Sequence, residues 1–256
     1  MSDSTQRFSN RVDNYTKYRP GYPDEVLLFL KQEGNLNTQA KIADIGSGTG
    51  IFTLLLLNEG YTVYAVEPND AMRYAADEQL SWNKKYHSVK GTAEATTLAA
   101  HSVDMIVCAQ AFHWFDAHKT KTEFERILKP GGKVALIWNN RQVEADDFSI
   151  AYEFLLQQQA SDYKRVNHQN LTEADFSAFF KDGCYELVKY PNIQVFDLKG
   201  LAGRAFSSSY VPAKDTPEGM AFMSQLTDVF NSYQVNGTVN MQYQTEVYLG
   251  PLPTLP

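Results

Sequence analysis

The sequence predicts an α/β protein built around one mostly parallel sheet. Between residues 40 and 139, short apolar runs alternate with amphipathic runs, which is the pattern of β-α-β units. A glycine-rich turn, DIGSGTG, joins the first apolar run to the first amphipathic one. Beyond residue 140 the alternation ends and helical segments fall between extended ones. We therefore expect a helical cap over the carboxyl ends of the strands, where open α/β sheets bind ligands.

The elements of the sheet core follow from the apolar runs and the residues that stop them. A helix closed by Gly60 and a strand stopped by Pro68 are explicit, and Asn69 can cap the helix that follows. The expected order is a strand at 40–46, a helix at 50–60, a strand at 61–68, a helix at 70–82, and strands at 87–91 and 103–110. The last of these has unbroken hydrophobicity, so it should be buried on both faces.

The remaining elements complete the sheet and form the cap. They are expected as a helix at 118–132 ended by a Pro-Gly-Gly turn, a strand at 133–140, helical residues at 145–182, an extended run at 184–198, a helix at 214–233 and a strand at 238–250. The two late extended runs should finish the sheet as a hairpin-like edge. The total is seven strands in one folded unit.

Composition limits the range of partners. The 256 residues can bury one large core with a cap, and a net charge of -7 without a lysine or arginine cluster disfavours a nucleic-acid partner. The longest apolar stretch, around Leu54–Leu57, is too short to span a bilayer, and residues 1–10 lack a signal-peptide core. We expect a cytoplasmic monomer or homodimer with a small-molecule substrate and no membrane partner. Cys108 and Cys184 are expected as buried structural thiols.

The glycine turn and the acid beyond it predict an adenosine-binding site. Gly46 and Gly48 allow a tight turn and close approach of a ligand to the backbone, and Gly50 permits close helix–strand packing. Glu67 ends the second strand 17 residues after Gly50, where it can accept hydrogen bonds from both ribose hydroxyls. An acid here disfavours the 2′-phosphate of NADP. The spacing also differs from the dinucleotide pattern G-x-G-x-x-G, and no lysine-bearing phosphate loop occurs.

Five motifs carry a resemblance to a known family. In DIGSGTG, AVEPNDAM, GTAE, VDMIVCAQAFHWF and LKPGG, the chain resembles the class I methyltransferases that depend on S-adenosylmethionine (SAM), and in particular the type 11 group with its trans-aconitate methyltransferase-like members. The motifs cover residues 40–139 in the right order. The resemblance implies a Rossmann-like fold with seven strands, helices on both faces and a helical cap. It also implies SAM as cofactor and S-adenosylhomocysteine (SAH) as product.

The resemblance divides the chain into three parts and assigns cofactor contacts. Residues 1–39 would close over the cofactor, 40–140 would bind it, and 141–256 would supply the cap and the final strands. Thr92 departs from the family pattern, which usually has an acid at this position. The implied cofactor-binding residues are Tyr15, Arg19, Asp44, Gly46, Ser47, Gly48, Gly50, Glu67, Pro68, Met72, Thr92, Ala93 and Gln110.

The motif AQAFHWFD at 109–116 raises the question of acid–base chemistry. Methyl transfer from a sulfonium is an in-line displacement, so a base is needed only if the acceptor must first lose a proton. His113 is the candidate catalytic base, and shaping the acceptor pocket is the alternative. The candidate substrate contacts are His113, Trp114, Arg141, Arg204 and Tyr210, in which the arginines suit a carboxylate. No metal site is expected, because no second ligand stands at suitable spacing from His113.

The leading hypothesis is therefore a SAM-dependent methyltransferase acting on a small molecule through a carboxylate or another oxygen or nitrogen nucleophile. A non-catalytic SAM-binding regulator shares the same cofactor loop. A NAD-linked oxidoreductase is disfavoured by the glycine spacing and by the lack of a second nucleotide-binding half. A nucleic-acid methyltransferase is disfavoured by the net charge and by AQAF in place of an Asn/Asp-Pro-Pro-aromatic motif.

Overall fold

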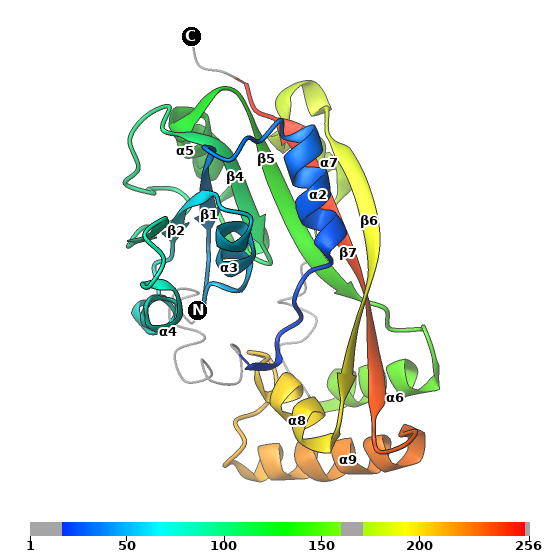
Figure 1. Cartoon of the computed structure of the whole chain (residues 1–256). Helices are drawn as coiled ribbons and strands as arrows, with labels where there is room; N and C mark the ends of the chain where they lie inside the picture. Colours follow the sequence, from blue (N-terminus) through cyan, green and yellow to red (C-terminus); the bar gives the residue numbers. More distant parts are fainter. Residues whose placement is uncertain (1–16, 160–170, 254–256) are drawn as a thin grey trace.

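The computed structural model describes residues 17–159 and 171–253 (Figure 1). Its centre is a seven-stranded sheet with the strand order β3-β2-β1-β4-β5-β7-β6. The strands are β1 (Lys41–Ile45), β2 (Thr62–Val66), β3 (Tyr86–Val89), β4 (Val103–Ala109), β5 (Leu128–Arg141), β6 (Glu186–Phe196) and β7 (Val239–Pro251). Pairing is parallel from β3 through β5, and β7 runs antiparallel to both β5 and β6. The predicted mostly parallel sheet with a late hairpin edge is confirmed.

Helices cover both faces of the sheet because successive residues of the buried strands point to opposite sides. Ile42 and Met105 pack in one apolar cluster with α2 (Asp24–Glu33), α3 (Ile51–Asn58) and α4 (Asp70–Leu80). Their chain neighbours Ala43 and Ile106 pack in a second cluster with α5 (Ala117–Ile127) and α7 (Glu173–Phe179). Short 3-10 turns occur at Phe112–Trp114 and Lys181–Gly183.

A third apolar cluster forms the cap. It joins α6 (Asp147–Gln159), α8 (Leu198–Phe206) and α9 (Pro217–Tyr233) to the far ends of β6 and β7. Figure 1 shows these two strands running from the sheet down to the three helices. At the other end, β7 continues beside β5, with Val247 opposite Ile137. One hairpin therefore belongs to both the sheet and the cap, which fixes the place of the cap at the end of the sheet.

Three expectations differ from the structure. The helix expected at 118–132 ends at Ile127, because residues 128–132 already belong to β5. Helix α8 was not expected, since Gly200 and Gly203 lower its helix propensity, but Asp197 caps it by accepting from the Gly200 N–H at 2.7 Å. Both cysteines are free, and Cys184 is exposed instead of buried. Within residues 17–159 and 171–253, no helix combines the length and the apolar character that crossing a bilayer requires.

Candidate active site

The glycine turn between β1 and α3 adopts a conformation that only glycine accepts readily. Gly46, Gly48 and Gly50 have φ angles of 69°, 57° and 83°. The backbone N–H groups of Gly46 and Ser47 donate to the Val66 carbonyl at 2.9 and 3.2 Å, which ties the turn to the end of β2. A Cβ on Gly46 would lie 2.6 Å from the Cβ of Ala111. The bare turn thus leaves room for both the loop after β4 and a ligand.

Asp44 and Thr49 leave buried polar atoms in this turn without partners. Oδ2 of Asp44 accepts from the Thr53 hydroxyl at 2.6 Å, but Oδ1 has no hydrogen-bond partner within the described residues, and neither has the hydroxyl of Thr49. Burial raises the pKa of Asp44 to about 7; the hydrogen bond from Thr53 opposes this shift, and the charge of Glu67 adds to it. A polar, cationic ligand group would satisfy both features.

Glu67 is held at the end of β2 by two backbone donors. Its Oε2 accepts from the Gly48 N–H at 2.9 Å and its Oε1 from the Asn69 N–H at 2.8 Å. Burial raises the pKa of this carboxyl, while these two hydrogen bonds and the charge of Arg73 oppose the rise. Because a carboxylate oxygen can accept more than one hydrogen bond, both oxygens can still receive ligand hydroxyls. Asn69 also caps α4, accepting from the Met72 N–H at 3.0 Å.

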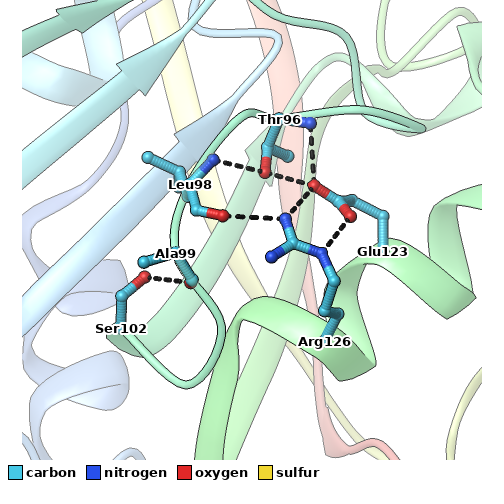
Figure 2. Close-up of polar contacts among 6 residues, drawn as sticks. All are labelled: Thr96, Leu98, Ala99, Ser102, Glu123 and Arg126. Carbon is cyan, nitrogen blue, oxygen red and sulfur yellow. Dashed lines mark hydrogen bonds and ion pairs between the residues drawn. The ribbon is translucent and has the colours of Figure 1, made fainter.

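The loop after β3, which carries Thr92 and Glu94, is fastened to α5 (Figure 2). The carboxylate of Glu123 accepts from the Thr96 backbone N–H at 2.8 Å and pairs with Arg126 at 2.7 Å. Arg126 in turn donates to the Leu98 carbonyl at 2.8 Å. Burial would raise the pKa of Glu123, but its bonds with Arg126 and Thr96 outweigh this and lower it. The carboxylate stays charged and holds this loop against the core.

The segment after β4 turns sharply and presents His113. Gln110 has a φ of 60°, and its N–H donates to the Ile137 carbonyl at 2.8 Å. The Nε1–H of Trp138 donates to Nδ1 of His113 at 3.3 Å, and Trp138 is 2% exposed. An indole nitrogen is only a donor, so the neutral His113 ring must carry its proton on Nε2. In that form Nε2 donates a hydrogen bond and does not accept a proton.

Two arginines at the cap end of the site, Arg141 from the end of β5 and Arg204 from α8, have different partners. Arg141 forms an ion pair with Glu153, and its guanidinium lies 5.0 Å from the ring centre of Tyr152. Arg204 is 7% exposed and donates from Nε to the Tyr243 hydroxyl at 3.1 Å and from Nη1 to the Ser208 hydroxyl at 3.0 Å. From the N-terminal side, Arg19 donates to the Ser207 carbonyl at 3.2 Å.

One cavity of about 290 Å³ connects the glycine turn, the turn after β4 and the cap. Of the residues predicted for the site, those that line it are Arg19, Asp44, Gly46, Ser47, Gly48, Glu67, Pro68, Met72, Thr92, Gln110, His113, Trp114, Arg141, Arg204 and Tyr210. Acids stand at the glycine-turn end and arginines at the cap end. The distribution of charge suits an elongated ligand or two ligands side by side.

Three of the residues predicted to bind the cofactor are not among the residues that line the cavity. Tyr15 lies outside the described residues. Gly50 packs behind the turn, where an added Cβ would lie 2.6 Å from Cδ1 of Leu80, so it permits contact with α4 rather than with a strand. Ala93 is buried in the second apolar cluster. No position within the described residues gathers three or more candidate metal ligands.

Asn139 and Tyr243 are among the lining residues that the sequence did not indicate. Asn139 follows the apolar run of β5, and the polar pair that ends this strand was the available signal. Tyr243 lies opposite Arg141 across the β5–β7 pair. Only the antiparallel register brings it to the site, and spacing along the chain does not reveal that register.

The comparisons with known proteins agree with this geometry. Residues 43–136 match the sequence profile of the methyltransferase domain family. The similarity to methyltransferase domains therefore covers this part of the chain. An uncharacterized methyltransferase of Mycobacterium tuberculosis is 34% identical over 143 residues, which is 54% of each chain. A probable SAM-dependent methyltransferase of Saccharomyces cerevisiae is 29% identical over 54% of this chain and 48% of its own length. The chain thus matches about half the length of these relatives.

Solved structures extend the likeness of the methyltransferase domain to the whole fold. A protein of Anaeromyxobacter dehalogenans, provisionally named a type II methyltransferase, superposes with a TM-score of 0.70 at 21% identity, over 92% of this chain and 99% of its own. A SAM-dependent methyltransferase of Geobacter sulfurreducens in complex with SAH gives a TM-score of 0.55 at 18% identity, over 98% of this chain and 100% of its own. The cap and the final hairpin therefore belong to a known arrangement.

Proposed function

We propose that this protein is a SAM-dependent methyltransferase that methylates a small molecule on a carboxylate or another oxygen or nitrogen nucleophile. The observation that carries the proposal is Glu67, a buried carboxylate aimed by two backbone N–H groups beside a glycine turn, in a cavity that continues into an arginine-bearing cap. This arrangement suits an adenosine ribose at one end and an acceptor at the other. The resemblance of motifs such as DIGSGTG and LKPGG to the type 11 group of small-molecule methyltransferases supports the choice.

The residues present fit the ribose, the adenine and the charged groups of the methionine end of SAM. Glu67 would accept hydrogen bonds from the ribose hydroxyls, and Met72 would pack against the adenine. The unpartnered Oδ1 of Asp44 would face the cationic methionine end, which SAM supplies as an ammonium and a sulfonium. Arg19 would pair with the carboxylate of SAM, and Gln110 would line the same end. Bound SAM supplies an activated methyl group, so the protein needs chiefly to hold the acceptor in line with it.

His113 is proposed as a hydrogen-bond donor that positions the acceptor. The indole N–H of Trp138 occupies Nδ1, which places the ring proton on Nε2. A donor at this position orients an acceptor oxygen that already carries a lone pair and a negative charge. A carboxylate meets that requirement without a base. We propose roles for three parts of the chain: residues 1–39, of which 1–16 lie outside the described residues, would cover the cofactor, 40–140 would bind it, and 141–256 would select the acceptor.

Calorimetry of the purified chain with SAM and SAH tests the cofactor. We expect binding of both, and Glu67→Ala to weaken SAH affinity about 10- to 100-fold through loss of a charged hydrogen-bond acceptor. Glu59→Ala removes an exposed glutamate at the far end of α3 and is the control. Absence of SAM and SAH binding to the wild-type chain would exclude the proposal. Binding of NADH in a fluorescence titration would favour the oxidoreductase instead.

Turnover with labelled SAM separates an enzyme from a regulator. Carboxylates, phenols and amines are offered in parallel, and methylated product is measured by transfer of label. We expect at least one class to accept the methyl group. A chain that binds SAM tightly and methylates none of them is the SAM-binding regulator.

A further inference from the structure

The cap contains a buried guanidinium that no carboxylate balances. Arg204 is 7% exposed and, within the described residues, forms no ion pair. Its hydrogen bonds run to two neutral hydroxyls, those of Tyr243 and Ser208. Burial would lower its pKa, but Tyr243, Tyr210 and Tyr152 and the hydrogen bond to Tyr243 raise it, so the group stays cationic. A buried charge without a counterion is costly unless a ligand supplies one.

The guanidinium is fixed so that part of it remains available to a ligand. Nε and Nη1 are held by Tyr243 and Ser208, while Nη2 makes no hydrogen bond with any described residue. Tyr243 is itself oriented, since its hydroxyl donates to Oε1 of Gln194 at 3.0 Å. Arg204, Tyr243 and Tyr210 all line the cavity that reaches the glycine turn. The guanidinium therefore faces the acceptor end of the site. Its orientation is fixed by Tyr243 and Ser208, and the N–H groups of Nη2 can donate to a ligand.

Arg141, which lines the same cavity from the end of β5, does not offer the same charge. Arg141 is paired with Glu153, and its guanidinium stacks against Tyr152. Burial raises the pKa of Tyr152, so its hydroxyl stays neutral and does not balance Arg204 either. Across the described cap, Arg204 is the buried cation that lacks an internal counterion. The sequence predicted Arg141 and Arg204 alike as substrate contacts, and this difference in partners distinguishes them.

We infer that Arg204, oriented by Tyr243 and Ser208, is an anion-binding subsite that selects acceptors bearing a carboxylate. Carboxylates match the planar donor edge of a guanidinium and supply the missing counterion. The inference rests on the proposed function for the identity of its ligand as a methyl acceptor. It specifies how the acceptor is held and leaves the reacting atom to be either the bound carboxylate or a second group of the same molecule.

The test measures binding of defined probes without turnover. Citrate, succinate and inorganic phosphate are titrated into the full-length chain by calorimetry, alone and with saturating SAH, and succinamide serves as the neutral counterpart of succinate. We expect citrate or succinate to bind the wild type and succinamide not to bind. Arg204→Gln should weaken that affinity about 10-fold or more, as loss of a charged hydrogen bond does. Arg204→Lys keeps the positive charge but lacks the planar donor edge of a guanidinium, so it should lose less carboxylate affinity than Arg204→Gln.

Lys199→Gln is the matched control, because it removes an exposed charge from the same helix and should change affinity less than twofold. Circular dichroism of each variant reports on folding, independently of its SAH affinity. The inference is overturned if neither carboxylate binds the wild type, if phosphate alone binds, or if Arg204→Gln binds the carboxylates as tightly as the wild type. Loss of SAH affinity in folded Arg204→Gln, with Arg204→Lys intermediate, would also overturn it by assigning Arg204 to the cofactor's carboxylate. If the wild-type protein binds carboxylates but not SAH, the anion-binding subsite is supported and the proposed methyltransferase function is refuted.

Discussion

Asp44 is a carboxyl group whose ionisation is opposed by burial. Its pKa is about 7 in the folded chain against 3.8 as the ordinary value, so the folded state holds the proton more tightly. The resulting stabilisation is complete below pH 3.8 and is lost as the pH rises through 7, by on the order of 4 kcal/mol. Asp44→Asn should therefore lose less unfolding free energy than the wild type between pH 4 and 8. Urea unfolding measures this, and parallel pH curves for the two proteins would contradict it.

The same carboxyl should link cofactor binding to pH. A cationic group beside Oδ1 favours the ionised form, so SAM binding should release a proton near pH 6 and become tighter toward pH 8. Calorimetry in two buffers of different ionisation enthalpy measures the released proton. Adenosine lacks both cationic groups and is the matched ligand, for which we expect no such release. A buffer-independent enthalpy for SAM at pH 6 would refute the link.

The size of the loss in kcat/KM on mutating His113 separates its two candidate roles, a positioning donor and a general base. A positioning donor is worth about 10-fold in kcat/KM, whereas a general base contributes about 10²- to 10⁴-fold. With an acceptor found by screening, we expect His113→Ala to lose about 10-fold, and His113→Gln, which retains an N–H donor, to recover part of it. The shape of the pH–rate profile should stay the same. Disappearance of an acidic limb together with a loss above 100-fold would establish His113 as a base.

At the scale of elements, the sequence correctly predicted the helix ends that depend on hydrogen bonds between residues close in the chain. Asn69 caps α4 as expected, and Gly60 ends α3 in a Schellman motif, with the Gly60 N–H bonded to the Leu57 carbonyl and the Tyr61 N–H to that of Leu56. The end of α5 was placed too late because its final carbonyls accept from His101 and Ser102, which lie 25 residues earlier in the chain. A contact of that kind has no local signature.

Gly50 and Gly60 have the same backbone conformation but different surroundings, so substituting each one separates the cost of backbone strain from the cost of a steric clash. Gly50 and Gly60 have φ angles of 83° and 84°, but an added Cβ meets Leu80 and Ala76 at Gly50 and nothing within 4 Å at Gly60. Gly60→Ala should cost about 1–2 kcal/mol from left-handed strain alone. Gly50→Ala should cost about 1–3 kcal/mol more, because the buried Leu80 side chain must move away from the added methyl group. Urea unfolding of both variants measures the difference, and equal losses would show that the Leu80 side chain moves at no cost.

At the scale of the molecule, the cofactor end of the cavity was largely predictable and the acceptor end was not. Asp44, the glycine turn and Glu67 lie on consecutive units whose strand ends meet at one edge of a parallel sheet. Asn139, Arg204 and Tyr243 meet only because β7 pairs antiparallel with β5 and carries the cap with it. The sequence identified Arg204 as a candidate by its charge, but its burial and its neutral partners depend on tertiary packing.

A partly buried polar cluster joins the sheet, the cap hairpin and the N-terminal segment. Asn139 donates to the Gly21 carbonyl at 3.0 Å and accepts from the Thr245 hydroxyl at 2.6 Å and from Nδ2 of Asn192 at 3.1 Å. Asn192 also donates to the Gly21 carbonyl at 2.9 Å. Since Arg19 and other neighbours of Gly21 line the cavity, this cluster should fix the wall that covers the cofactor.

We expect Asn139→Ala to destabilise the fold by about 1–3 kcal/mol, because Thr245 is 0% exposed and its hydroxyl would lose its acceptor. The variant should also bind SAH more weakly, since the Gly21 carbonyl loses one of its two side-chain donors. Asn240→Ala, on the exposed face of β7, is the control and should change stability by less than about 0.5 kcal/mol. A double-mutant cycle with Asn192→Ala then measures cooperation through the shared carbonyl, for which we expect a coupling of at least about 0.5 kcal/mol. Additive losses with unchanged SAH affinity would mean that the two asparagines act independently and that the wall is held elsewhere.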